Sequence, residues 1–267
     1  MEWIRAHEAL QTFTGTFASD SLRGNDFQGY ECGNWEDETW VLHPIFELID
    51  ATDTRTYDVA HRAEALDSIP DDEVGQRMRS ILERPGTILT GTRSGLLADP
   101  GAQWRRVRWA EYLARSGRDL HQQVGFPAHN WFAESSWSVS VLSPCEGSMD
   151  IPTLNAVHRT LFRRSRKTKV GQCLFLFAGA HCPDADARVA RGGLDELSDA
   201  IEELRSLTGR AYAPNNMWSA ELEWFTYTDI DLMATKICGS RSLVNAIRRH
   251  PYLETCELLA LPGDAEP

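Results

Sequence analysis

No apolar run in this sequence approaches the roughly 20 residues that a helix needs to cross a bilayer. The first eight residues also lack the basic and apolar regions of a secretory signal. These two absences argue against a membrane protein and a secreted one. The sequence therefore predicts a soluble chain in the cytoplasm that does not contact a membrane.

Cys-x-x-Cys pairs are missing as well, although the chain has six cysteines. Without a signal for secretion, scattered cysteines are expected to be buried thiols and not a disulfide framework. The sequence also lacks glycine-rich phosphate loops, Gly-x-Ser-x-Gly and His-Glu-x-x-His. Each absence argues against a common enzyme class, so the sequence predicts no metal site and names no cofactor.

The composition is that of a globular protein of 267 residues, with 42% hydrophobic and 25% charged residues. Its net charge of -12 is uneven: residues 1–100 carry -11, residues 101–170 carry +6 and residues 171–267 carry -7. Because an acidic surface repels phosphate, general affinity for nucleic acid is not expected. Only the middle third could bind an anion, or a nucleic acid in a salt-dependent way.

Residues 170–178 are an unbroken apolar run of strand length, which is typical of a strand covered on both faces. We expect this strand to be central to the fold. From residue 136 onward the periodicity predicts the order β-α-β-α-β-β-α-β, with a long loop over residues 179–193. That order favours crossover connections and a mixed β-sheet with packed helices, an α+β or α/β fold.

The first half of the chain is less regular, and we expect two lobes, residues 1–130 and 131–267. Within the first lobe, residues 40–42 are predicted as a strand and Pro44 as the start of a short helix. Residues 71–82 are predicted as a helix with an apolar stripe, and residues 100–114 as another.

Glu38, His43 and Glu47 are the first candidate for chemistry. If the helix at Pro44 begins one residue early, His43 and Glu47 share a face, with Glu38 nearby, which would suit a transition metal or acid-base work. The favoured alternative is structural, with His43 bonded to the backbone and Glu47 solvated. The flanking Trp35 and Trp40 suit a core or an interface equally.

His181 and Cys182 follow the central strand, where loops of open sheets often bind ligands. A thiol there could be a nucleophile, although nearby acids would raise its pKa, and a structural role is favoured. Cys145 follows an expected strand in the same way. His121 and His129 flank the expected lobe boundary without metal spacing.

A basic run near the end of the helix predicted over 151–163 is the candidate anion or partner site. Guanidinium groups grip phosphate or carboxylate, although cations also suit a helix end. The residues proposed for binding are Arg163, Arg164, Arg166, Lys167 and Lys169.

Two functions remain open. The first is a binding module without chemistry of its own, one that neutralises or regulates a basic protein partner, because acidic surfaces speed the capture of basic partners. The second is an enzyme of unassigned class, with an inter-lobe active site using Glu38, His43, His129, His181 and Cys182. The ligand would be a protein partner or a small molecule.

Overall fold

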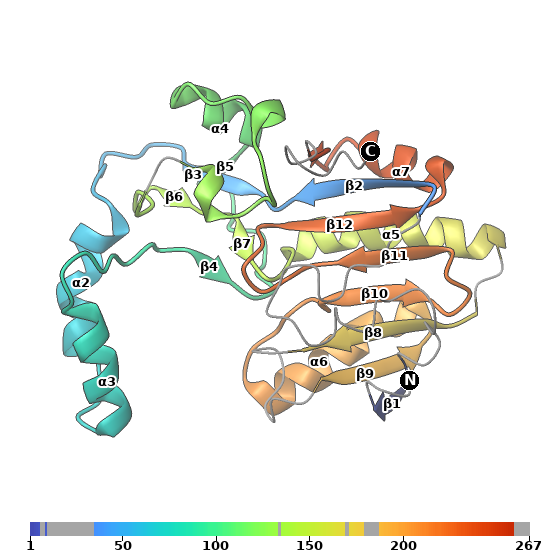
Figure 1. Cartoon of the computed structure of the whole chain (residues 1–267), viewed down its shortest axis with the longest axis horizontal. Helices are drawn as coiled ribbons and strands as arrows, with labels where there is room; N and C mark the ends of the chain where they lie inside the picture. The colour runs from blue at the N-terminus through green and yellow to red at the C-terminus, as the bar shows by residue number, and fades with distance from the viewer. Residues whose placement is uncertain (6–8, 10–34, 133–134, 169–170, 179–186, 259–267) are drawn as a thin grey trace, which may run out of the picture.

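The computed structural model describes residues 1–5, 9, 35–132, 135–168, 171–178 and 187–258, and the fold is α+β (Figure 1). Its largest unit is an eight-stranded sheet in the order β1-β9-β8-β10-β11-β12-β2-β13, with every neighbouring pair antiparallel. The strands are β1 (Glu2–Arg5), β2 (Asp37–Leu42), β8 (Cys173–Phe177), β9 (Arg188–Gly192), β10 (Asn216–Ser219), β11 (Trp224–Tyr227), β12 (Ala234–Gly239) and β13 (Thr255–Cys256).

The predicted central strand is confirmed as β8, an interior strand whose five residues are all buried. Its side chains alternate between two apolar clusters: Cys173, Phe175 and Phe177 belong to one, and Leu174 and Leu176 to the other. The run is unbroken because both faces of the strand are covered.

Three helices cover one face of the sheet (Figure 1): α5 (Ile151–Thr168), α6 (Leu197–Thr208), which follows the short helix η5 (Leu194–Glu196), and α7 (Arg241–Arg248). Local signals fix their ends. Ser240 caps α7 by accepting a hydrogen bond from the Leu243 N–H, and Gly209 ends α6 in the left-handed region at φ 73°. None of the helices in the described part of the chain has the length and apolar character that a bilayer crossing requires.

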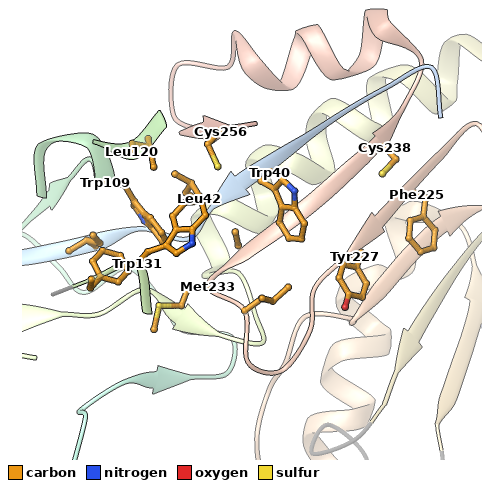
Figure 2. Packing of buried hydrophobic residues seen from close by; sticks show 14 of the residues in the cluster. Trp40, Leu42, Trp109, Leu120, Trp131, Phe225, Tyr227, Met233, Cys238 and Cys256 are labelled. Atoms are coloured by element: carbon orange, nitrogen blue, oxygen red, sulfur yellow. The ribbon is translucent and has the colours of Figure 1, made fainter. Parts of the chain in front are cut away.

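Aromatic side chains fill the core on the other face of the sheet. They come from the sheet itself and from a segment holding α4 (Trp109–Arg115), η2 (Leu120–Gln122) and η3 (His129–Trp131). Figure 2 shows Trp109, Leu120 and Trp131 facing Leu42 and Trp40 of β2 in this cluster.

The boundary expected at residue 130 does not separate two sheets. β1 and β2, from the first 130 residues, are strands of the same sheet as β8 to β13. A smaller part of the fold lies outside that sheet. It comprises a three-stranded sheet, β5-β3-β6, and a parallel pair, β4 with β7, whose strands are β3 (Ile45–Leu48), β4 (Arg93–Ser94), β5 (Trp104–Val107), β6 (Val141–Leu142) and β7 (Cys145–Glu146).

Two predicted helices were wrong in part. The helix expected at Pro44 is strand β3, and residues 104–107 of the helix expected over 100–114 are strand β5, which pairs with it. The reason is tertiary, since the ladder and an ion pair between Glu47 and Arg105 (2.9 Å) hold the two segments together.

The strand-helix order after residue 136 also differs from the prediction. The segment expected to be a long loop contains β9, and β10 precedes the confirmed hairpin of β11 and β12. These short strands carry weak patterns, because buried Asn216 and Ser219 replace apolar residues in β10. Neighbouring strands of the sheet are all antiparallel, and α6 carries the chain across β8 from β9 to β10.

The helices α2 (Tyr57–Asp67) and α3 (Glu73–Leu82) form an arm that extends away from the large sheet (Figure 1). No residue of α2 is buried, and Gly75 is the buried residue of α3. The stripe expected to face a core is instead open to solvent, with Val74, Met78 and Ile81 exposed by 66%, 50% and 50%.

Candidate functional site

His43 is a structural histidine in this fold. Its side chain is fully buried, Nδ1 lies 2.6 Å from the Cys145 carbonyl oxygen, and Nε2 lies 3.0 Å from the Thr235 hydroxyl. Because a carbonyl only accepts, Nδ1 donates to Cys145 and Nε2 accepts from Thr235. Burial lowers the pKa of His43 to about 4. Neither nitrogen is left for a metal or for proton transfer.

Glu38 does not join His43. Five residues of extended chain separate them, about 17 Å at strand spacing, and Glu38 instead forms an ion pair with Lys236 (2.9 Å). The neighbouring tryptophans belong to the core, since Trp40 is buried beside Tyr227 and Trp35 stacks on Phe225 with ring centroids 6.4 Å apart.

Three of the remaining predicted residues, His181, Cys182 and Lys169, lie outside the described residues. Arg163, Arg164, Arg166 and Lys167 lie on α5. Of the five residues expected to form an inter-lobe active site, only His129 therefore remains, in the described part of the chain, as a residue that lines a pocket.

His129 lines a pocket of about 390 Å³ at the junction between the large sheet and the smaller strands. The turn between β11 and β12 holds the junction together, because the Met233 N–H donates to the Pro127 carbonyl and the Gly147 N–H donates to the Leu232 carbonyl. Seven residues line this junction pocket: Phe126, Ala128, His129, Asn130, Glu146, Asp231 and Leu232.

Two carboxyl groups, those of Glu146 and Asp231, line the junction pocket. Burial, together with the nearby charge of Asp231, raises the pKa of Glu146 to about 7. Burial also raises the pKa of Asp229, in the same turn. The fold therefore holds the partly buried Glu146 close to the exposed Asp231, where ionisation of Glu146 is costly unless a cation arrives.

His129 adds an imidazole to this wall. Its ring packs edge-on against Trp137 with centroids 5.9 Å apart. Its Nδ1 atom is buried and has no hydrogen-bond partner among the described residues. Within those residues, no group of three or more His, Cys, Asp or Glu side chains could hold a metal ion. The pocket thus offers carboxylates to a ligand, beside an imidazole whose Nδ1 is closed to solvent.

We expect Glu146→Gln to make the protein more stable at pH 8. A carboxyl whose pKa is raised from 4.5 to about 7 weakens the fold progressively as pH rises through that window. Allowing for screening at a partly exposed group, the gain at pH 8 is on the order of 1 kcal/mol, or about 2–4 °C in Tm. Calorimetry at pH 8 and pH 5 checks it, and an equal Tm change at both would contradict it.

Sequence reasoning found His129 and missed Glu146, Asp229 and Asp231. Acids in a hairpin turn are normally solvated, and Glu146 shows no pattern of its own beside Cys145. Only the pairing of the turn with residues 127 and 147 brings them together.

In comparisons with known proteins, no family model, no curated protein and no solved structure matches this chain. Its function therefore has to be inferred from its own residues.

Proposed function

We propose that this protein is a binding module without chemistry of its own, and that the junction pocket receives a cationic side chain of a basic protein partner. The observation that carries the proposal is the partly buried carboxyl of Glu146 near the charge of Asp231, in a pocket that Phe126, Ala128 and Leu232 also line. Arginine and lysine have this amphipathic form, an apolar stem with a charged head. Phe126 and Leu232 suit the stem, and the two acids suit the head.

The charge of the whole chain supports the same partner. A net charge of -12 attracts basic proteins over long range and raises their association rate. A cation bound beside Glu146 would also offset the repulsion between the acids. This repulsion destabilises the free protein, so its removal adds to the binding energy.

A cytoplasmic location is part of this proposal. The described cysteines Cys145, Cys173, Cys238 and Cys256 are buried and form no disulfide. Burial raises the pKa of the Cys145 thiol to about 11 and that of Cys173 to about 12, which keeps them protonated and unreactive. Such thiols suit a reducing compartment.

Calorimetric titration with N-acetyl-arginine amide tests the proposal, with N-acetyl-norleucine amide as the uncharged probe. We expect saturable binding of the arginine derivative at millimolar concentration and at least tenfold weaker binding to Glu146→Gln, as expected for a lost charged hydrogen bond. Because Glu146 is about half protonated near pH 7, binding should release about half a proton, seen as a heat that depends on the buffer.

The matched control is Glu203→Gln, which removes an exposed acid on α6 and the same unit of charge. It should bind the arginine derivative like the natural protein. Equal weakening in Glu203→Gln and Glu146→Gln would mean that net charge alone attracts the ligand, and the pocket would lose its role.

An enzyme with a site at this junction is the second candidate, favoured by one observation. A carboxyl with a pKa of about 7 beside an imidazole is suited to proton transfer at neutral pH. If Glu146 and His129 work as a pair, His129→Asn should shift the Glu146 titration measured by carbon NMR. If the cation pocket is the function, Asp231→Asn should lower the Glu146 pKa and His129→Asn should leave it unchanged.

A further inference from the structure

A second pocket of about 460 Å³ lies between α5 and α7, on the helical face of the sheet. The junction pocket lies on the opposite face of the sheet. Its Leu232 belongs to the core cluster of that face, and its Phe126 packs against the cluster. The α5–α7 groove is lined by Thr160, Arg163, Arg164, Ser242, Leu243, Ala246, Arg249, His250 and Pro251. Its volume falls in the range of small-molecule sites.

The charged residues lining this groove are all basic. The exposed Arg163 of α5 and Arg249 at the end of α7 have no ion pair within the part of the chain that the structure describes. Arg248, one residue before Arg249, is by contrast bound to Asp37 (2.8 Å) and Glu257 (2.8 Å). In a protein of net charge -12, the described residues that line this groove include no acid, whereas the neighbouring Arg248 has two acidic partners.

His250 adds a neutral donor to the same wall. The Tyr252 N–H lies 3.2 Å from its Nδ1, so Nδ1 accepts and the ring proton sits on Nε2. Burial lowers the pKa of His250, and the charges of Arg163 and Arg159 on α5 lower it further. The positive field of the arginines is therefore felt inside the groove.

We infer that the α5–α7 groove binds the phosphate group of a small phosphomonoester. One arginine satisfies a carboxylate bidentately, whereas a phosphate presents three oxygens and close to two charges to donors arriving from two helices. Leu243, Ala246 and Pro251 provide apolar surface beside the cations for the organic part of the ligand. The inference is independent of the cation pocket proposed above.

The usual preference of cations for helix ends does not account for this groove. That preference explains basic residues near the end of α5 or of α7 taken singly. It does not explain why two cationic stretches, one from each helix, line a single groove whose described lining residues include no acid. The negative helix ends oppose an anion only weakly compared with several charge-assisted hydrogen bonds.

Phenyl phosphate, inorganic phosphate and benzoate are the probes, titrated against the full chain and followed by nitrogen-15 NMR. We expect saturable binding of phenyl phosphate, weaker binding of inorganic phosphate and at least tenfold weaker binding of benzoate. Bound phosphate should also raise the pKa of His250, because the anion offsets the field of Arg159 and Arg163.

The double variant Arg163→Gln/Arg249→Gln should weaken phenyl phosphate binding at least tenfold. The control Arg210→Gln, at an exposed arginine beyond α6, should leave it unchanged. Glu146→Gln should have no effect either, which separates this site from the junction pocket. Equal binding to the natural protein and the double variant, equal affinity for benzoate, or displacement only by an oligonucleotide with steep salt dependence would each overturn the inference.

Discussion

Trp109→Ala is expected to lower the free energy of unfolding by about 3–5 kcal/mol, the usual cost of removing a fully buried indole. The Trp109 side chain has no solvent exposure, and its ring lies edge-on to Trp131 and Phe132, at 6.0 and 4.7 Å between centroids. Its Nε1–H donates to the His43 carbonyl (2.7 Å). Figure 2 shows it where α4 and the smaller strands meet β2. Its removal leaves a cavity and an unpaired carbonyl together.

Equilibrium unfolding in urea measures this change, and two further variants separate its causes. Trp109→Phe keeps much of the apolar volume and loses the hydrogen bond, so we expect a loss of about 1–3 kcal/mol. Trp104→Ala removes a partly exposed indole from β5 and should cost less than Trp109→Ala. A Trp109→Ala loss no greater than that of Trp104→Ala would mean that the aromatic cluster does not join the two parts of the fold.

The second large effect is a loss of stability in mild acid that depends on His43. Its pKa is near 6.5 in the unfolded chain and about 4 in the fold, because the buried ring has to stay neutral. The stabilisation is therefore complete above pH 6.5 and is lost as pH falls toward 4, by about 3 kcal/mol in all. Protonation of Nε2 also places a second donor against the Thr235 hydroxyl.

Urea unfolding of the natural protein and His43→Gln at several pH values from 7 to 4 tests this. The variant should be less stable at pH 7, and its stability should fall less between pH 6.5 and 4. Glu146 acts in the opposite direction over the same range in both proteins, so it cancels from the comparison. His121→Gln, at an exposed histidine, should follow the natural curve, and parallel curves for His43→Gln would contradict the prediction.

The sequence predicted the elements whose signals are local. Ser240 and the apolar spacing of Leu243, Val244 and Ile247 were sufficient for α7, and the apolar run before Ala178 was sufficient for β8. The pairing of β3 with β5 was not predictable, because ladder bonds decided between helix and strand there. Likewise, the stripe of α3 has helical spacing whether or not a core faces it.

The proposed binding sites show the same difference between what local signals predict and what tertiary packing decides. Arg163 and Arg164 belong to the basic run that the sequence indicated as a candidate anion site, whereas Arg249 and His250 were not among the candidates. The first pair lies on α5 and the second directly follows α7, so the packing of α5 against α7 decides that they share one groove. The shared pocket of Glu146 and Asp231 could not be predicted for the same reason, because they lie 85 positions apart in the sequence and only the packing at the junction brings them together.

The α2–α3 arm has a consequence for spectroscopy. None of the nine tryptophans of the chain lies between residues 57 and 89, so tryptophan emission reports the sheet and its aromatic core alone. Far-ultraviolet circular dichroism adds the two helices of the arm, which bury no apolar side chain of their own. Melting of the arm therefore lowers the dichroism directly, and it reaches the emission only through Trp137, whose carbonyl accepts from the Tyr57 N–H at the start of α2 (2.7 Å).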